Sequence, residues 1–302
     1  MHNNVGRGLK DELRGVLPPA TVPFDEKGEI AFEGLHEQID FLIGSGASAV
    51  VVGGSTGEGH TLSNEEFKRV VTEACKATAG RVPFVTGLIV NSTHQAIERV
   101  KMLRELKICA LQVTPVHYLF KPDTLGTIDH FRTIWEQIKI PIIIYNVIPW
   151  NYLSVDMMLQ IMDEVPGVVG IKQSSGDLKS VSDLLLRANP NNLILTGIDA
   201  LLYPAFMLGA TGAITALTSA VPGAVVSLYK AVQRGDHTAA KDMHFRLNAL
   251  WNVIPHDNLP ACVKYIQHLQ GIKLYQPRLP MAPVSDPLKA AIDVELKNVL
   301  CS

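Results

Sequence analysis

The sequence predicts an α/β protein: a (β/α)8 TIM barrel followed by a small C-terminal helical domain. Three observations support this prediction. Eight short β-rich runs occur along the chain, and segments with helical apolar spacing lie between them. The β-rich runs are mostly continuously apolar, which is typical of parallel strands covered on both faces. We expect the catalytic barrel to span residues 1–235 and the α-helical extension to span residues 236–302.

The eight predicted strands are short apolar runs that follow one another at the spacing of strand-helix units. They are Gly15–Val22, Ser48–Gly53, Phe84–Leu88, Ala110–Thr114, Pro141–Asn146, Val168–Lys172, Leu193–Gly197 and Gly212–Thr215. Helical spacing is clear in Phe32–Ile43, Glu66–Ala79 and Thr93–Leu106. Sequences with the form of a capping box begin at Ser63 and Ser92, before the second and third of these helices.

The pattern changes after a turn at residues 234–236. His237–Trp251, Leu259–Leu269 and Pro287–Val299 are predicted helices, and no strand is predicted between them. A doubly wound open sheet is the main alternative to the barrel. Such a sheet usually carries a glycine-rich dinucleotide turn after its first strand, and the turn after Val22 has none.

Composition excludes several classes of protein. The 302 residues are 47% apolar and 19% charged, which favours a large core over disorder. The formal net charge is −2 without long Lys or Arg runs, so nucleic acid and anionic membrane are not expected partners. Four scattered cysteines form no Cys-x-x-Cys pair, which favours reduced thiols. The N-terminal segment is not a signal peptide and no apolar run spans a bilayer, so we expect a soluble, cytoplasmic protein.

The sixth predicted strand ends on Lys172, where barrels of this kind carry their catalytic groups. Burial of an amine disfavours its cationic form. A neutral amine can attack a ketone to form an imine, which when protonated stabilises negative charge on the adjacent carbon. Lys172 is therefore a candidate nucleophile. The alternative is a lysine whose head group reaches solvent at the strand end.

Two other strand ends carry side chains that suit this chemistry. Tyr145 ends the fifth strand, and on the inward face its phenol would lie beside Lys172 and shuttle protons. Gly54, Ser55 and Thr56 follow the second strand, where glycine allows close approach and the hydroxyl and N–H groups suit a carboxylate. The alternatives are a rim aromatic with an ordinary hydrogen bond and a flexible turn. The turn lacks the G-K-[ST] of a nucleotide-binding P-loop.

Four ordered motifs at these strand ends resemble the dihydrodipicolinate synthase / N-acetylneuraminate lyase family. They are Gly54-Ser55-Thr56-Gly57-Glu58, Thr114-Pro115, Tyr145-Asn146-Val147 and Gly170-Ile171-Lys172. Val22-Pro23-Phe24-Asp25 and Leu279-Pro280-Met281-Ala282-Pro283 are also similar, so the resemblance covers nearly the whole chain. Each motif is weak alone, whereas the four in this order are strong together.

The resemblance implies a barrel with a helical C-terminal domain, assembled as a homotetramer of paired dimers. It implies that Lys172 forms a Schiff base with pyruvate or a pyruvate-derived 2-oxo acid, and that Tyr145 is the proton-relay phenol. Ser55 and Thr56 would bind the carboxylate, and the Thr56 hydroxyl would join the relay. An aldehyde is the further small-molecule partner of some reactions, and neither a cofactor nor a metal is implied. Gly54, Gly197 and Ile214 would line the pocket.

The stretch after Tyr145 departs from the family pattern. Synthases of the family carry an arginine there that holds the carboxylate of the second substrate. In this chain Asn151 stands at that place if one residue is inserted, and Trp150 stands there if none is. Neither side chain can form a bidentate charged contact with a carboxylate.

Two further stretches also depart from the family pattern. After Thr114-Pro115 the family often has two tyrosines, the second of which reaches a partner subunit's site. His117 matches that tyrosine by count and Tyr118 matches it by residue type, and both remain candidates. Ser174 follows the lysine and adds a hydroxyl that could reach a polyol substrate or assist elimination.

The leading hypothesis is a class I lyase, an aldolase or dehydratase acting on a 2-keto-3-deoxy sugar acid or a related substrate, because the arginine is missing. The alternatives within this class are 4-hydroxy-tetrahydrodipicolinate synthase and, suggested only by Trp150, a hydratase-aldolase of aromatic 2-oxo acids. A non-catalytic barrel that binds a 2-oxo acid as a regulator is the alternative from another class. A nicotinamide-dependent oxidoreductase would fit the α/β pattern but lacks the glycine fingerprint.

Overall fold

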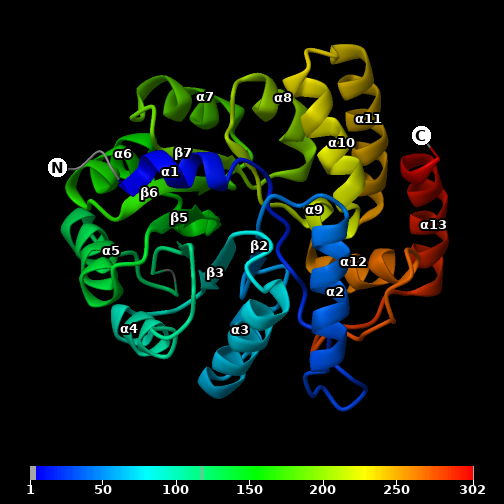
Figure 1. Cartoon of the computed structure of the whole chain (residues 1–302), viewed down its shortest axis with the longest axis horizontal. Helices are drawn as coiled ribbons and strands as arrows, with labels where there is room; N and C mark the ends of the chain where they lie inside the picture. Colours follow the sequence, from blue (N-terminus) through cyan, green and yellow to red (C-terminus); the bar gives the residue numbers. More distant parts are fainter. Residues whose placement is uncertain (1–4, 117, 302) are drawn as a thin grey trace.

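The computed structural model, which describes residues 5–116 and 118–301, confirms the (β/α)8 barrel (Figure 1). Eight parallel strands are hydrogen-bonded in the order β1-β8-β7-β6-β5-β4-β3-β2. Bonds from Ala20 N to Val51 O (2.8 Å) and from Val51 N to Pro18 O (3.0 Å) close the ring beside β1 and β2. The strands are β1 (Gly15–Val16), β2 (Val50–Val52), β3 (Phe84–Leu88), β4 (Ala110–Val113), β5 (Ile142–Asn146), β6 (Val168–Gln173), β7 (Leu193–Thr196) and β8 (Gly212–Ala213).

The first and last strands are shorter than their sequences predict. β1 ends at Val16 rather than Val22 because Pro18 and Pro19 have no N–H to donate to a sheet. β8 ends at Ala213 because Thr215 already caps the next helix, accepting a bond from Thr218 N.

Helices and short 3-10 turns connect the strands. They are α1 (Val5–Glu12), α2 (Phe32–Gly44), η1 (Gly59–Thr61), α3 (Asn64–Thr78), α4 (Thr93–Lys101), α5 (Thr124–Ile138), η2 (Pro149–Asn151), α6 (Val155–Glu164), α7 (Leu178–Arg187), η3 (Asp199–Leu201), α8 (Leu202–Met207), α9 (Ala216–Ala220) and α10 (Pro222–Gln233). The predicted capping box at Ser63 is confirmed. At Ser92 the prediction is half correct, because the Gln95 carboxamide accepts its bond from Asn91 N instead.

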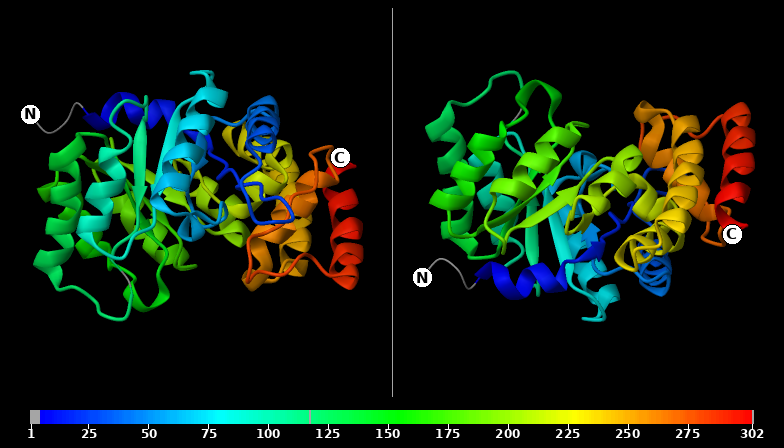
Figure 2. Two further views of the ribbon diagram at one scale, coloured as in Figure 1. Left: turned by 90° about the horizontal axis from the view of Figure 1, so that it is seen from below. Right: turned by 90° about the horizontal axis from the view of Figure 1, so that it is seen from above.

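The core has two layers, one inside the strands and one between strands and helices. Val51, Ile143 and Leu195 belong to the inner layer, and Leu9 and Leu13 from the α1 region join it. Figure 2 shows α1, in dark blue, across one end of the strands. Apolar side chains fill the part of the barrel near the amino ends of the strands. The polar side chains of the strands therefore lie nearer the carboxyl end.

Three further helices follow the barrel, as predicted: α11 (His237–Val253), α12 (Leu259–His268) after the turn η4 (His256–Asn258), and α13 (Asp286–Leu300). They share one apolar cluster with α8, α9 and α10, which includes Leu217, Leu247 and Ile292. Figure 1 shows α10–α13 together on one side of the barrel. The domain boundary at residue 235 stays a prediction. In the described part of the chain, no helix combines the length and apolarity needed to cross a membrane.

Candidate active site

Lys172 and Tyr145 lie side by side at the carboxyl end of the barrel. The two residues are paired in register across β5 and β6. Both side chains are buried, with 5% of Lys172 and 4% of Tyr145 exposed. The Lys172 Nζ atom lies 3.8 Å from the centroid of the Tyr145 ring, and the Tyr145 hydroxyl lies 3.3 Å from Ser55 Oγ. The structure therefore brings together three of the predicted site residues, from the loop after β2, from β5 and from β6.

The loop that carries Ser55 and Thr56 depends on close backbone packing. Gly53 has φ +83°, a conformation that favours glycine. A Cβ atom at Gly57 would lie 2.6 Å from Ala20 O, and one at Gly59 would lie 2.2 Å from Gly53 O. The chain can fold back on itself here only without side chains at these positions. This packing holds Thr56 buried and Ser55 half-buried at the barrel mouth.

Gly197 and Ser174 form the wall beside the lysine. A Cβ atom at Gly197 would lie 2.0 Å from Ser174 Oγ and 3.0 Å from Lys172 Cε. Glycine at this position therefore leaves the space that the lysine side chain crosses. Ser174 is buried, and its Oγ has no hydrogen-bond partner among the described residues. Ile214 is fully buried and belongs to the layer inside the barrel.

A buried carboxylate near Lys172 was not predicted from the sequence. Asp199 is 4% exposed and accepts hydrogen bonds from Leu217 N (2.6 Å) and Ala216 N (3.4 Å). Burial raises the pKa of Asp199, and these bonds and the charge of Lys172 oppose the shift. The carboxylate thus tethers the start of α9 to the loop after β7. A polar residue just after β7 was the only signal in the sequence.

The candidates in η2 and in the loop after β4 are bonded to one another. Trp150 is 65% exposed and its Nε1 donates to Tyr118 O (2.9 Å), whereas Asn151 is buried and its Nδ2 donates to Val116 O (2.6 Å). Both therefore fasten η2 to the loop after β4. Tyr118 is 67% exposed, so within this chain its side chain points away from the interior. His117 lies outside the described residues.

A second buried lysine holds the Ser55 loop from the C-terminal side. Lys264 Nζ on α12 donates to Glu58 Oε2 (2.6 Å), and Arg278 N donates to Glu58 Oε1 (2.8 Å). The side chains of this ion pair are 2% and 1% exposed. Burial lowers the pKa of Lys264, and the Glu58 carboxylate opposes that shift. Glu58, at φ +53°, is thus fixed two residues after Thr56 by the helical extension.

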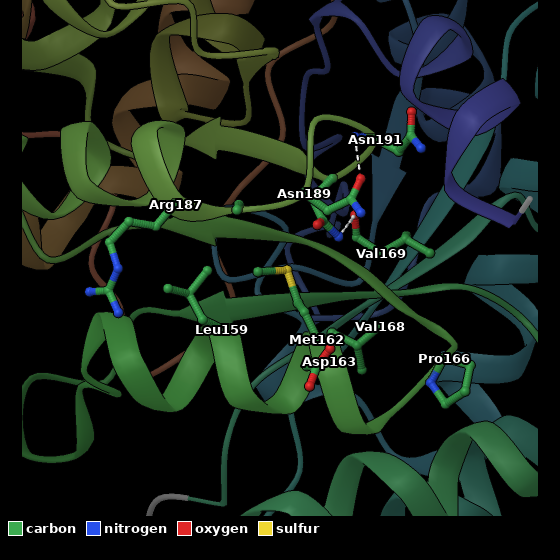
Figure 3. Close-up of a pocket in the computed structure, with 11 residues that line it drawn as sticks. Leu159, Met162, Asp163, Pro166, Val168, Val169, Arg187, Asn189 and Asn191 are labelled. Atoms are coloured by element: carbon green, nitrogen blue, oxygen red, sulfur yellow. Dashed lines mark hydrogen bonds between the residues drawn. The ribbon is translucent and has the colours of Figure 1, made fainter. Parts of the chain in front are cut away.

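A pocket of about 300 Å³ lies between α6 and α7 at the opposite end of the strands (Figure 3). Its lining includes Asn189 and Asn192, from the loop before β7, and Arg187, which is paired with Asp156 at 2.6 Å. Because these residues precede their strands, the pocket faces the amino end of the barrel.

Across residues 5–116 and 118–301, no cluster of three His, Cys, Asp or Glu side chains is arranged to hold a metal ion.

Comparison with known proteins shows which family this chain is similar to. A model described as the dihydrodipicolinate synthetase family matches residues 12–299. The 4-hydroxy-tetrahydrodipicolinate synthase of Methanothrix thermoacetophila is 35% identical over 292 residues, which cover 95% of this chain and 96% of that protein. The enzyme of the same name from Leptothrix cholodnii is 32% identical over 288 residues, covering 94% and 97%.

Solved structures agree as well. The crystal structure of dihydrodipicolinate synthase from Aquifex aeolicus has a TM-score of 0.87 at 32% identity, and the match covers 94% of this chain and 97% of that one. Family members are lyases that work through a Schiff base, so the chain is an enzyme of this type rather than a binding protein. With a family model matched over nearly its whole length, this chain belongs to the dihydrodipicolinate synthetase family.

Proposed function

We propose that Lys172 captures pyruvate as an imine and that the enamine formed from it attacks an aldehyde. The observation that carries this proposal is the pair of buried residues Lys172 and Tyr145 beside the half-buried Ser55, with Nζ 3.8 Å from the phenol ring centroid and the phenol oxygen 3.3 Å from Ser55 Oγ. An imine-forming amine beside a phenol suits carbinolamine chemistry, in which protons must move at each step.

The proposed steps balance without an outside redox agent. The Lys172 amine attacks C2 of pyruvate, and the carbonyl oxygen leaves as water after Tyr145 delivers a proton. Loss of a proton from C3 gives the enamine, whose C3 forms a carbon–carbon bond to the aldehyde carbon. The aldehyde oxygen takes up a proton, and water then hydrolyses the imine and releases Lys172.

The other residues of the pocket bind and shape the 2-oxo acid. Ser55 and Thr56 bind its carboxylate, and Thr56 joins Tyr145 in the proton relay. Gly54 allows the ligand to approach the backbone, because it adds no side chain. Gly197 and Ile214 line the side of the pocket near Lys172.

The first candidate for the second substrate is L-aspartate 4-semialdehyde, which would make this chain a 4-hydroxy-tetrahydrodipicolinate synthase. That aldehyde and pyruvate together supply the carbon atoms of the product in the enzyme name. The names of the relatives support this alternative over the sugar-acid lyase that the sequence favours, because they are 32–35% identical across almost the whole chain.

A 2-keto-3-deoxy sugar acid is the second candidate. It is supported by Trp150 and Asn151, which stand where synthases carry a carboxylate-binding arginine. It is also supported by Ser174, whose buried hydroxyl has no partner among the described residues and lies, like the Lys172 side chain, beside Gly197. An uncharged pocket wall of this kind suits hydroxyl groups better than a second carboxylate.

A substrate panel separates the candidates. Pyruvate consumption with aspartate semialdehyde should exceed pyruvate release from 2-keto-3-deoxy sugar acids, with Lys172→Ala as the blank. Faster turnover of a sugar acid would select the second candidate. No turnover of either, with no imine formed from pyruvate, would overturn the proposed function.

The assembly we propose is a homotetramer, a dimer of dimers. Its support is a group of large exposed apolar side chains at the barrel mouth: Tyr118, Leu119, Phe120, Leu125 and Trp150, each 65–84% exposed. Covering them with a second copy would bring a partner's His117 or Tyr118 toward the relay. Light scattering of the wild type and of Phe120→Asp measures the assembly, and a monomeric wild type would contradict it.

A further inference from the structure

Gln112 is a buried side chain whose two polar atoms have no partner among the described residues. Gln112 is 1% exposed, and neither Nε2 nor Oε1 has a hydrogen bond to the described part of the chain. Most buried amides in proteins are paired, because leaving them unpaired costs free energy of folding. A buried carboxamide in this state therefore points to a ligand or to a role in function.

The strand pattern places Gln112 inside the barrel. On β4, Ala110 belongs to the apolar layer inside the strands, whereas Leu111 and Val113 belong to the layer outside them. Since side chains alternate along a strand, Gln112 points inward with Ala110. Its register partner on β5 is Ile143, which is also inward and lies two residues before Tyr145.

The carboxamide extends toward the loop that carries Ser55. The atom nearest to a Cβ built at Gly54 is Gln112 Nε2, at 3.7 Å. The register partner of Gln112 on β3 is Gly87, which has no side chain to fill this part of the interior. Gln112 Nε2 therefore lies beside the start of the Gly54-Ser55-Thr56 turn, on the strand next to that of Tyr145.

We infer that Gln112 is a further substrate-binding residue, whose Nε2 donates a hydrogen bond to the carboxylate of the 2-oxo acid. This rests on the proposed function, in which Ser55 and Thr56 bind that carboxylate. An amide N–H near Gly54, at the start of the turn that carries the Ser55 and Thr56 hydroxyls, adds a donor that suits an anionic acceptor without a proton. The carboxylate of the 2-oxo acid is then the hydrogen-bond partner of Gln112 Nε2.

The test compares Gln112→Met with Gln267→Met. Gln267 is also 1% exposed, but it is fully bonded: its Nε2 donates to Ser219 O and its Oε1 accepts from Gln38 Nε2, both at 2.9 Å. For each protein, borohydride reduction at a series of pyruvate concentrations gives the pyruvate concentration that half-saturates adduct formation at Lys172. Thermal unfolding gives Tm.

Gln112→Met should raise the half-saturating pyruvate concentration about tenfold or more, because a hydrogen bond to a charged group is lost. Its Tm should be no lower than that of the wild type, because the variant buries no unpaired amide. Gln267→Met should lower Tm by about 2–4 °C or more and leave half-saturation unchanged. If Gln112→Met does not fold, Gln112→Glu has the same length and should weaken pyruvate capture further through charge repulsion.

Two results would overturn this inference: an unchanged half-saturation in the Gln112 variants, or an equal rise in Gln267→Met. Failure of the proposed function would give a different result, because the wild type itself would then form no adduct with pyruvate.

Discussion

Two buried lysines in this protein have different surroundings. Lys172 and Lys264 are 5% and 3% exposed, and each Nζ atom lies over an aromatic ring, 3.8 Å from the Tyr145 centroid and 4.7 Å from the Phe24 centroid. Lys264 also donates to Glu58 Oε2 (2.6 Å) and to Gln276 O (2.8 Å). Both lysine side chains are thus buried, and the amine of Lys264 is in addition hydrogen-bonded to a carboxylate.

The difference separates a structural lysine from a reactive one. A bonded carboxylate and carbonyl hold the Lys264 amine in place, and its lone pair is unavailable for attack while it stays protonated. Asp199, a buried carboxylate whose pKa burial raises and the charge of Lys172 lowers, is bonded to backbone N–H groups of Leu217 and Ala216 instead. Lys172 therefore lies next to the Tyr145 phenol, and its side chain passes beside Gly197.

Removal of the reactive amine should have the largest effect. Lys172→Ala should lower turnover by roughly 10⁴-fold or more, because no other group forms the imine. The Glu58→Gln/Lys264→Met double variant removes the other buried lysine together with its partner charge, and it should lose less than about tenfold. Steady-state pyruvate consumption measures both. If Lys172→Ala and the double variant lost turnover to a comparable extent, Lys172 could not be called the reactive lysine and Lys264 the structural one.

Breaking the ion pair on one side should chiefly affect stability. Glu58→Gln leaves the Lys264 ammonium buried without its counter-charge, so we expect the free energy of unfolding to fall by about 3–5 kcal/mol. Asp40→Asn breaks the exposed Arg81–Asp40 pair and serves as the control, with an expected loss below about 1 kcal/mol. Urea denaturation measures both, and equal losses would show that the buried pair contributes no more than a surface pair.

His130 extends the comparison to a buried base without a bonded carboxylate. Its Nδ1 lies 3.0 Å from Thr93 Oγ1, and burial lowers its pKa from 6.5 to about 4. Between these values the unfolded chain binds more protons, so stability falls as pH decreases from 6.5 to 4, by about 3 kcal/mol in total. His130→Gln should remove this part of the pH dependence. Denaturation at pH 7 and pH 4.5 tests it, and an unchanged slope would contradict it.

Tyr145→Phe should lower turnover less than Lys172→Ala does. Loss of the phenol oxygen should slow turnover about 10²-fold, because proton transfer is impaired at several steps. The free energy of unfolding should change by less than about 1 kcal/mol, since the hydroxyl contributes one 3.3 Å bond to Ser55. A turnover rate within a factor of two of the wild type would remove Tyr145 from the relay.

Much of the fold and the centre of the site could be predicted because parallel strands bring their carboxyl ends to one rim. Lys172, Tyr145 and Ser55 each follow an apolar run, so their strand positions alone placed them together. The short extent of β1 was harder to predict, because the prolines after Val16 interrupt pairing without changing the apolar pattern.

The residues that surround and support the site could not be predicted from the sequence, and the reason is different. Glu58 and Lys264 are 206 residues apart, and no local pattern shows which charges will pair across a fold. Asp199 and Gln112 each look like single polar residues beside apolar runs. Their significance depends on burial and on bonds made or left unmade, which only the packed structure defines.

The most direct test of the central claim is to reduce the protein with borohydride in the presence of pyruvate and to map the adduct by peptide mass spectrometry. We expect one stable pyruvate-derived adduct, on Lys172, and none on Lys264. An adduct on Lys264, or no adduct on Lys172 in the native protein, would contradict it.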